Sequence, residues 1–482
     1  MSKKKSIGIN AVMSVMNSIM SIIFPLITFP YISHIFQVED LGRFNFAKNY
    51  VDIFCTIAFL GIPTYAIREG AKIRDDREKI EKLLSELFTI GIYSSLLLSF
   101  FSVILSFFAS KLHKYIVLIS IFTIVIPFKM IGQEWIYNIY EDFTAFTFIS
   151  IVMNAISVVL MFMFVHTPND VEVYAIITVI STAGANVLMF FWGRTYCKVR
   201  TVKNTFLKKH LKAIIVLFST YLSVIIYNKT DTALLGLLCG DYQVGIYSVS
   251  TKIYNMIKNC LLALTNVLQA QAVINIASDN HDIINSYLTK CFNVLLTFVM
   301  PCIFGIVITS LDIIELISGK EYMTAQSSLI ILSVALFFAI FSTMQSSCIL
   351  IPNSDEVFTL KGALLGAIIN LLLNFVFIPL WNENGAAFTT LIAEAVVFFY
   401  YLNRCRLYYN YRDYIFSLKC VVCCIVMSIA TYFIGTHIES LIQRIIIEII
   451  MSVLIYGLMQ IVTRNPFMID IIWKLREMHG GS

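Results

Sequence analysis

Long apolar runs recur from one end of this chain to the other, and they constrain its fold more than any other feature. Each run is close to the roughly 20 residues that an α-helix needs to cross the hydrocarbon layer of a membrane. Because 58% of the residues are hydrophobic and only 13% are charged, no soluble fold could bury so much apolar surface. The sequence therefore predicts an all-α polytopic membrane protein.

Charged or turn-forming clusters separate these runs into fourteen predicted spans. Their approximate limits are 8–33, 43–67, 87–110, 115–139, 146–166, 172–194, 213–238, 244–274, 286–310, 324–350, 358–381, 385–404, 416–436 and 442–463. Lys and Arg gather in the segments that face the cytoplasm if both termini lie inside, most densely in 194–212. This charge bias predicts an even number of spans with both termini cytoplasmic.

The chain also carries a weak internal repeat. Leu41-Gly42-Arg43-Phe44 aligns with Val244-Gly245-Ile246-Tyr247, and each block follows an apolar helix and a short polar turn. Six spans precede the basic segment 194–212, so both copies would cross the membrane in the same sense. We expect two six-helix lobes, 1–200 and 201–412, related by a pseudo-two-fold axis along the membrane normal. The segment 413–482 would add two further helices and a cytoplasmic tail.

Several blocks, in order along nearly the whole chain, resemble a known family. They are Leu41-Gly42-Arg43-Phe44, Glu134-Trp135-Ile136-Tyr137, Thr230-Asp231-Thr232-Ala233-Leu234-Leu235-Gly236 and Gly385-Ala386-Ala387-Phe388. Together they are similar to the polysaccharide transport branch of the multidrug/oligosaccharidyl-lipid/polysaccharide (MOP) exporter superfamily, which includes the Wzx flippases and shares its two-lobe plan with MATE exporters. The chain departs from the family at Gln269-Ala270-Gln271-Ala272, where a proline is usual.

The resemblance implies a flippase working by alternating access in the bacterial cytoplasmic (inner) membrane. Its cargo would be an undecaprenyl-pyrophosphate-linked oligosaccharide unit of O-antigen (lipopolysaccharide), capsule or exopolysaccharide, moved from the inner to the outer leaflet. Partners would be membrane lipids and the polymerase and chain-length regulator of the same pathway. A proton or sodium gradient could drive the exchange, and no other cofactor is expected.

Two polar stripes are the candidate substrate-binding groups. One follows helical spacing around Lys48 in the second span, and the other does so around Lys252 in the eighth, at related positions of the repeat. Lysine suits a pyrophosphate because its ammonium acts as a point charge. The alternative is that these side chains only hold helices together. The predicted substrate-binding residues are Lys48, Asn49, Lys252, Asn255 and Asn259.

Three intramembrane carboxylates are predicted to couple an ion or to form charge pairs. Asp52 lies one helical turn from Lys48, and Asp231 lies at a depth similar to that of Lys252. Glu394 could exchange a proton or could hold two helices together. We expect no catalytic residue and no metal site.

Other functions fit the sequence less well. A peptidoglycan precursor flippase would carry a similar head group and stays open as an alternative. A MATE-type drug exporter would favour a negatively charged cavity, so lysines in both lobes argue against it. A membrane polymerase would need a large outer loop, and none is predicted. The basic clusters lie beside helix ends, where topology and anionic lipids account for them, so no nucleic-acid partner is expected.

Overall fold

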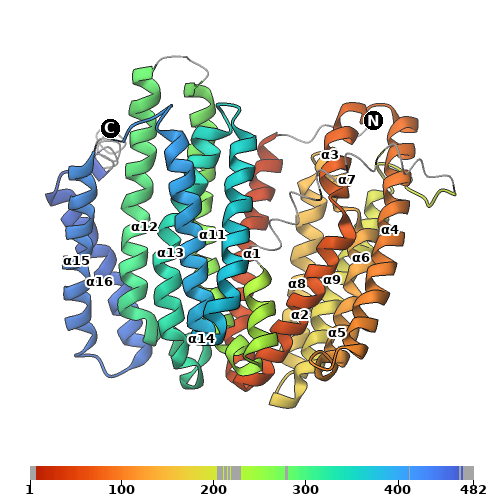
Figure 1. The fold of residues 1–482 in the computed structure, drawn as a ribbon, viewed down its shortest axis with the longest axis horizontal. Helices are drawn as coiled ribbons and strands as arrows, with labels where there is room; N and C mark the ends of the chain where they lie inside the picture. Colours follow the sequence, from red (N-terminus) through yellow and green to blue (C-terminus); the bar gives the residue numbers. More distant parts are fainter. Residues whose placement is uncertain are drawn as a thin grey trace, which may run out of the picture. The chain divides into compact units, whose positions relative to one another are not determined.

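The computed structural model describes residues 7–203, 229–276, 281–411 and 413–465, together with residues 210, 214, 218, 468 and 469, and the elements in these ranges are all helices. Eleven helices in this described part are long and apolar enough to cross a membrane. The chain is therefore a multi-pass membrane protein. It divides into two compact units, Met1–Gly245 and Ile246–Ser482 (Figure 1). The finer division at 200/201 and 412/413 stays a prediction.

The first unit is a bundle of transmembrane helices. In chain order it contains α1 (Ile7–Ile35), α2 (Val38–Phe59), α3 (Ile62–Ile73), α4 (Arg77–Phe108), η1 (His113–Tyr115), α5 (Ile116–Thr123), α6 (Val125–Gly132), α7 (Glu134–Ile139), α8 (Phe143–Phe164), η2 (Pro168–Asp170), α9 (Val171–Gly193) and the first turn of α11. The predicted span 43–67 is interrupted because Leu60 and Gly61 both take positive φ, which ends α2 and starts α3.

The second unit contains the rest of α11 (Asp241–Ile276), α12 (His281–Ser318), η3 (Lys320–Ala325), α13 (Gln326–Met344), the π-helical turn η4 (Gln345–Leu350), α14 (Glu356–Cys405), α15 (Tyr414–Gly435) and α16 (Leu441–Val462). The helices α12, α15 and α16 pack against one another, and so do α13 and α14.

The long element α14 holds two of the predicted spans, because it reverses direction at Asn382. This residue has φ 52° and ψ −129°, outside the helical region. The two halves then pack side by side. Asn374 accepts a hydrogen bond from Thr389 at 2.5 Å, and Arg404 forms an ion pair with Asp355 at 2.7 Å. With α1 added, the described helices account for every predicted span except 213–238, of which only the helical end at 229–238 and single residues before it are described.

The repeat seen in the sequence corresponds to a reciprocal contact between helix starts in the first unit. A Cβ added to Gly42 would lie 1.9 Å from the carbonyl oxygen of Asp241, and one added to Gly245 would lie 2.1 Å from that of Val38. The two glycines, and likewise Val38 and Asp241, are equivalent positions in the sequence alignment. Two equivalent helix starts therefore meet through a local two-fold arrangement, and only glycine lets the backbones approach so closely.

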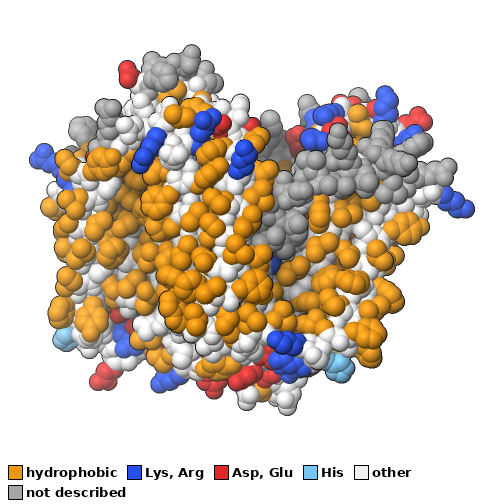
Figure 2. All heavy atoms as spheres, viewed as in Figure 1, with side chains coloured by type: hydrophobic (Ala, Val, Ile, Leu, Met, Phe, Trp, Pro, Cys, Tyr) orange, Lys and Arg blue, Asp and Glu red, His pale blue; other side chains and the backbone are white. Residues whose placement is uncertain are grey.

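Each unit presents the surface expected of a lipid-facing protein. On the face shown in Figure 2, hydrophobic side chains cover the middle of each unit, while Lys, Arg, Asp and Glu gather toward its two ends. Large apolar side chains such as Phe100 and Phe108 are more than half exposed. In water such a surface would drive aggregation, but in a bilayer lipid chains cover it.

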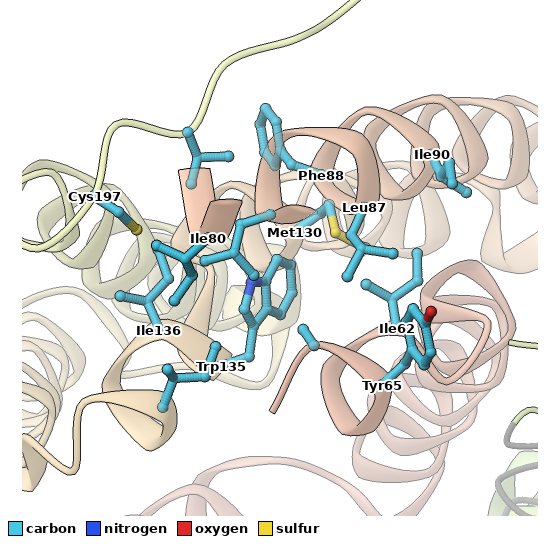
Figure 3. Packing of buried hydrophobic residues seen from close by; sticks show 14 of the residues in the cluster. Ile62, Tyr65, Ile80, Leu87, Phe88, Ile90, Met130, Trp135, Ile136 and Cys197 are labelled. Atoms are coloured by element: carbon cyan, nitrogen blue, oxygen red, sulfur yellow. The ribbon is translucent and has the colours of Figure 1, made fainter. Parts of the chain in front are cut away.

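A buried apolar cluster at one end of the first unit fixes the short helices α6 and α7 against α3 and α4. Trp135 is 2% exposed and lies among Ile80, Leu87 and Met130 (Figure 3). Gly91 leaves room for the sulfur of Met130, since an added Cβ would lie 2.4 Å from it. This packing holds the neighbouring residue Lys129 in place on α6.

Candidate functional site

Lys48 lies at the midpoint of α2, ten residues from its start, which places it about 15 Å from either helix end at 1.5 Å per residue. Its side chain is exposed, and among the described residues it forms no ion pair. A lysine at this depth is tolerated mainly where water or a polar ligand reaches it. The structure thus agrees with an accessible ammonium group at this position.

Asp52 has a different partner from the one that the sequence suggested. Its Oδ2 lies 3.1 Å from Nζ of Lys229, at the start of the helical segment 229–238. Lys48 lies within electrostatic range of the same carboxylate but is not its ion-pair partner. Asp52 is therefore a charge-paired group, and Lys48 is not needed to neutralise it.

A third lysine joins this cluster from another helix. Lys129 on α6 interacts electrostatically with Asp52 and with Glu134 on α7. It also lies within electrostatic range of Lys48. Three ammonium groups thus share two carboxylates, so the cluster carries a net positive charge. We refer to Lys48, Lys129, Lys229 and Asp52 as the lysine cluster.

Asn49 lies beside the lysine cluster, but its amide is engaged in packing. It is 7% exposed and donates a hydrogen bond to the backbone carbonyl of Lys229 at 2.9 Å. This bond ties the start of the 229–238 segment to α2 and so positions the Lys229 ammonium. Its proposed contact with substrate stays a prediction.

The second unit places its predicted site residues along α11. Asn255 and Asn259 are exposed, whereas Lys252 is half-buried. The spacing of these three residues puts them on one face of the helix. Asp231 is 7% exposed and lies in the first unit, so its predicted pairing with Lys252 also stays a prediction.

Glu394 is held in an ion pair. Its Oε1 lies 3.1 Å from Nζ of Lys258, and the ammonium also lies 5.3 Å from the ring centre of Tyr254. The carboxylate side chain is only 6% exposed and the lysine 19%. Of the two roles considered for Glu394, the charge pair now has a partner, whereas proton coupling remains to be tested.

Two lysines that take part in this chemistry, Lys229 and Lys258, were not predicted from the sequence. Each lies within or at the edge of an apolar run, and a charge in such a run is the sequence feature that could have identified it as a functional residue. Their partners lie on other helices, 177 residues away for Lys229 and 136 for Lys258. Helical spacing within one span cannot reveal such distant pairs.

The chain is similar to proteins that are named as a transporter and a flippase. It is 22% identical over 380 residues to the "Putative O-antigen transporter" of Escherichia coli (strain K12), a match that covers 77% of this chain and 90% of that one. It is 23% identical over 175 residues to the "Probable low-salt glycan biosynthesis flippase Agl15" of Haloferax volcanii, covering 35% and 36% of the two chains.

Solved structures share its fold. A structure of the lipid II flippase MurJ in an inward closed conformation superposes with a TM-score of 0.77 at 16% identity, covering 95% of this chain and 99% of that one. An inward-facing MATE family transporter of the MOP superfamily gives 0.59 at 14% identity over 82% and 98% of the two chains. At these identities the likeness shows the fold alone.

A family model settles the membership of the chain. The model described as "Polysaccharide biosynthesis protein" matches residues 7–270, which is more than half of the sequence. The protein therefore belongs to the polysaccharide biosynthesis protein family.

Proposed function

We propose that this protein is a flippase for an undecaprenyl-pyrophosphate-linked oligosaccharide unit, which it moves between membrane leaflets by alternating access. The observation that carries this proposal is the lysine cluster in the middle of the first unit. It is supported by the MOP-type fold and by relatives that are named as an O-antigen transporter and a glycan flippase.

The cluster suits a pyrophosphate because it offers more cations than its own carboxylates neutralise. Lys229 is occupied by Asp52 at 3.1 Å and Lys129 interacts with Glu134, which leaves Lys48 as the cation in excess to attract an anionic group. Partial desolvation strengthens such an attraction, since the effective dielectric constant within a membrane protein is far below that of water. An exposed ammonium on a flexible stem can also follow a phosphate that changes position during transport.

The oligosaccharide requires hydrogen-bonding groups rather than charge. The exposed amides of Asn255 and Asn259 on α11 provide donors and acceptors for sugar hydroxyls. Lys252 on the same face adds a second cation. The first unit thus carries a polar surface rich in charge, and the second carries one rich in amides.

The bias of Lys and Arg along the sequence supports an orientation with both termini in the cytoplasm of a bacterial cell, in its inner membrane. Cysteines introduced in place of Asn169 and Lys203 test this orientation. An impermeant thiol reagent added to intact cells should label the first and not the second. Because Cys260 is exposed, both are compared with the unsubstituted chain. Equal labelling of both positions would contradict the orientation.

In the inner membrane of a bacterial cell, the polymerase and chain-length regulator of the same pathway are the expected partners.

Substitution of Lys48 tests the cargo site. Lys48→Ala should lower transport of a fluorescent undecaprenyl-pyrophosphate oligosaccharide in proteoliposomes about tenfold or more, because a charge-assisted contact contributes roughly 1.5–3 kcal/mol. Lys48→Arg should retain more activity, since it keeps the charge. Lys72→Ala is the matched control, because Lys72 is 63% exposed at the end of α3 and pairs with Glu69.

The pair of Asp52 and Lys229 separates cargo binding from structure. Lys229→Ala leaves a carboxylate without its partner, so Lys229→Ala combined with Asp52→Asn should recover much of the lost protein abundance. Lys48→Ala should gain nothing from Asp52→Asn. If Asp52→Asn instead restored the transport lost in Lys48→Ala, Lys48 would be a neutralising group and the cargo site would be refuted. Transport of a peptidoglycan precursor in preference to the oligosaccharide would redirect the proposed cargo.

A further inference from the structure

A polar stripe runs along α16 in the second unit, through a helix that otherwise faces lipid. Apolar residues on its other faces, such as Ile446, Val453 and Leu458, are more than half exposed. The stripe repeats every four residues and so follows one side of the helix, where α16 packs against α12 and α15. Its members are Arg444, Glu448, Ser452, Tyr456 and Gln460.

The members around Glu448 are joined to neighbouring helices by hydrogen bonds or an ion pair. Tyr456 donates to the backbone carbonyl of Thr297 on α12 at 2.9 Å, and Ser452 lies 2.9 Å from Thr431 on α15. Nη2 of Arg444 lies 2.5 Å from Oδ1 of Asp312 on α12. These contacts show that the stripe is a built interface and not an accidental run of polar residues.

Glu448 is the exception. It is 4% exposed, and its Oε2 has no hydrogen-bond partner among the described residues. Nε of Arg444, one helical turn away, is also buried without an acceptor. Gly435 on α15 makes room for the carboxyl group, since a Cβ there would lie 2.1 Å from Oε1 of Glu448. The absence of a side chain at Gly435 therefore leaves room for the Glu448 carboxyl group, yet Oε2 of Glu448 lacks a hydrogen-bond partner among the described residues.

The charges around this carboxyl group determine what it can bind. Asp312 on α12 and Arg444 on α16 are the charged groups that interact electrostatically with it, and α15 carries no charged residue near this end. The ion pair with Asp312 already occupies Arg444. A buried carboxylate without a partner is strongly disfavoured, whereas the neutral acid is readily accommodated. The guanidinium also disfavours a metal cation at this place, so the ligand that fits is a proton.

We propose that Glu448 is a proton-binding site in the contact between α12 and α16, loaded from the end where Arg444 and Asp312 are partly exposed. The proton passes between the Glu448 carboxyl group and water. When Glu448 is protonated, Arg444 binds Asp312 and ties α16 to α12. When the proton leaves, the new carboxylate competes for Arg444, which can reach it along the same helix at i, i+4 spacing. Proton release therefore weakens the contact between the last helix and α12.

Infrared difference spectroscopy of the full-length protein in lipid vesicles tests this site without any transport substrate, so its result does not depend on the proposed cargo. The protein is cycled between acidic and alkaline buffer, and the carbonyl band of protonated carboxyl groups is followed. Glu448→Gln should remove one component of this band. Glu439→Gln is the control, because Glu439 is exposed in the α15–α16 turn and should change only the component of a carboxyl group in water.

A second readout distinguishes a proton switch from a merely structural role. Protection of the amides at the Arg444 end of α16 from hydrogen exchange, taken relative to the intrinsic exchange rate at each pH, should fall at alkaline pH in the unsubstituted protein. This protection should stay high at all pH values in Glu448→Gln, which mimics the protonated acid and keeps its shape. Glu448→Asp retains a titrating group and should retain pH-dependent protection. An unchanged infrared band in a correctly folded Glu448→Gln variant would overturn the proposal. So would loss of the band on adding sodium at constant pH, since it would indicate a metal cation instead.

Discussion

The ion pair between Lys258 and Glu394 predicts that removing either charge alone is more damaging than removing both. The two groups lie 3.1 Å apart, on α11 and on the second half of α14, and both are largely shielded from water. Glu394→Gln leaves the Lys258 ammonium without its partner, and Lys258→Gln leaves the carboxylate. The double variant has neither charge.

The size of the effect follows from the geometry. At 3.1 Å and an effective dielectric constant of roughly 20, the attraction is about 5 kcal/mol. Much of it offsets the cost of removing both charges from water, so replacing the pair by neutral groups is nearly neutral. Removing one partner costs about 3–5 kcal/mol, because the other charge remains buried. An unfolding entropy of roughly 2.1 cal/mol/K per residue over 482 residues gives about 1 kcal/mol/K, so Tm should fall by about 3–5 °C.

The assay is thermal unfolding of the detergent-solubilised protein, read by intrinsic fluorescence. Each single variant should lose about 3–5 °C, and the double variant should lie within about 1–2 °C of the unsubstituted protein. Lys361→Gln is the matched control, since Lys361 is an exposed lysine on α14 and surface changes are usually within about 0.5 kcal/mol. If the single variants were as stable as the control, the pair would not contribute as argued.

The same variants separate the two roles considered for Glu394. If the pair is structural, transport should fall in Glu394→Gln and recover in the double variant together with stability. If Glu394 exchanges a proton, the double variant should regain stability but not transport. Persistent loss of transport at normal Tm would therefore refute a purely structural role.

Two further predictions concern the fold. Gly42→Ala should lower the yield of folded protein, because its Cβ would lie 1.9 Å from a backbone oxygen that cannot move aside, and size-exclusion chromatography should show aggregation. Gly457→Ala should leave the elution profile unchanged, since no atom lies within 4 Å of the added Cβ. Hydrogen bonds from Arg404 hold the pKa of Asp355 below its usual value. A lowered carboxyl pKa contributes stability above the unfolded value of about 3.9, and this contribution is lost as pH falls through the folded value. Protection from hydrogen exchange at the two ends of α14, taken relative to the intrinsic exchange rate at each pH, should therefore fall in acid, and Asp355→Asn should show low protection already at neutral pH.

The sequence by itself determined the class of fold and the order of the spans. Apolar runs of sufficient length leave few alternatives to helices in a membrane, because only a helix satisfies its own backbone hydrogen bonds there. The reversal at Asn382 could be anticipated, since the sequence separated spans 358–381 and 385–404. The alignment of Gly42 with Gly245 also pointed to equivalent positions, and these proved to be the points where two helix starts meet.

Only the tertiary structure decided which charges are paired and which stay available. Hydropathy and helical spacing describe patterns within a single segment of about 20 residues. The partner of a buried charge depends instead on how each helix is rotated against its neighbours. Asp52 is therefore paired with Lys229, not with Lys48 one turn away, and Glu394 is paired with Lys258. Glu448 gave no signal in the sequence, because a single carboxylate in an apolar run does not reveal whether a neighbouring helix provides it with a partner.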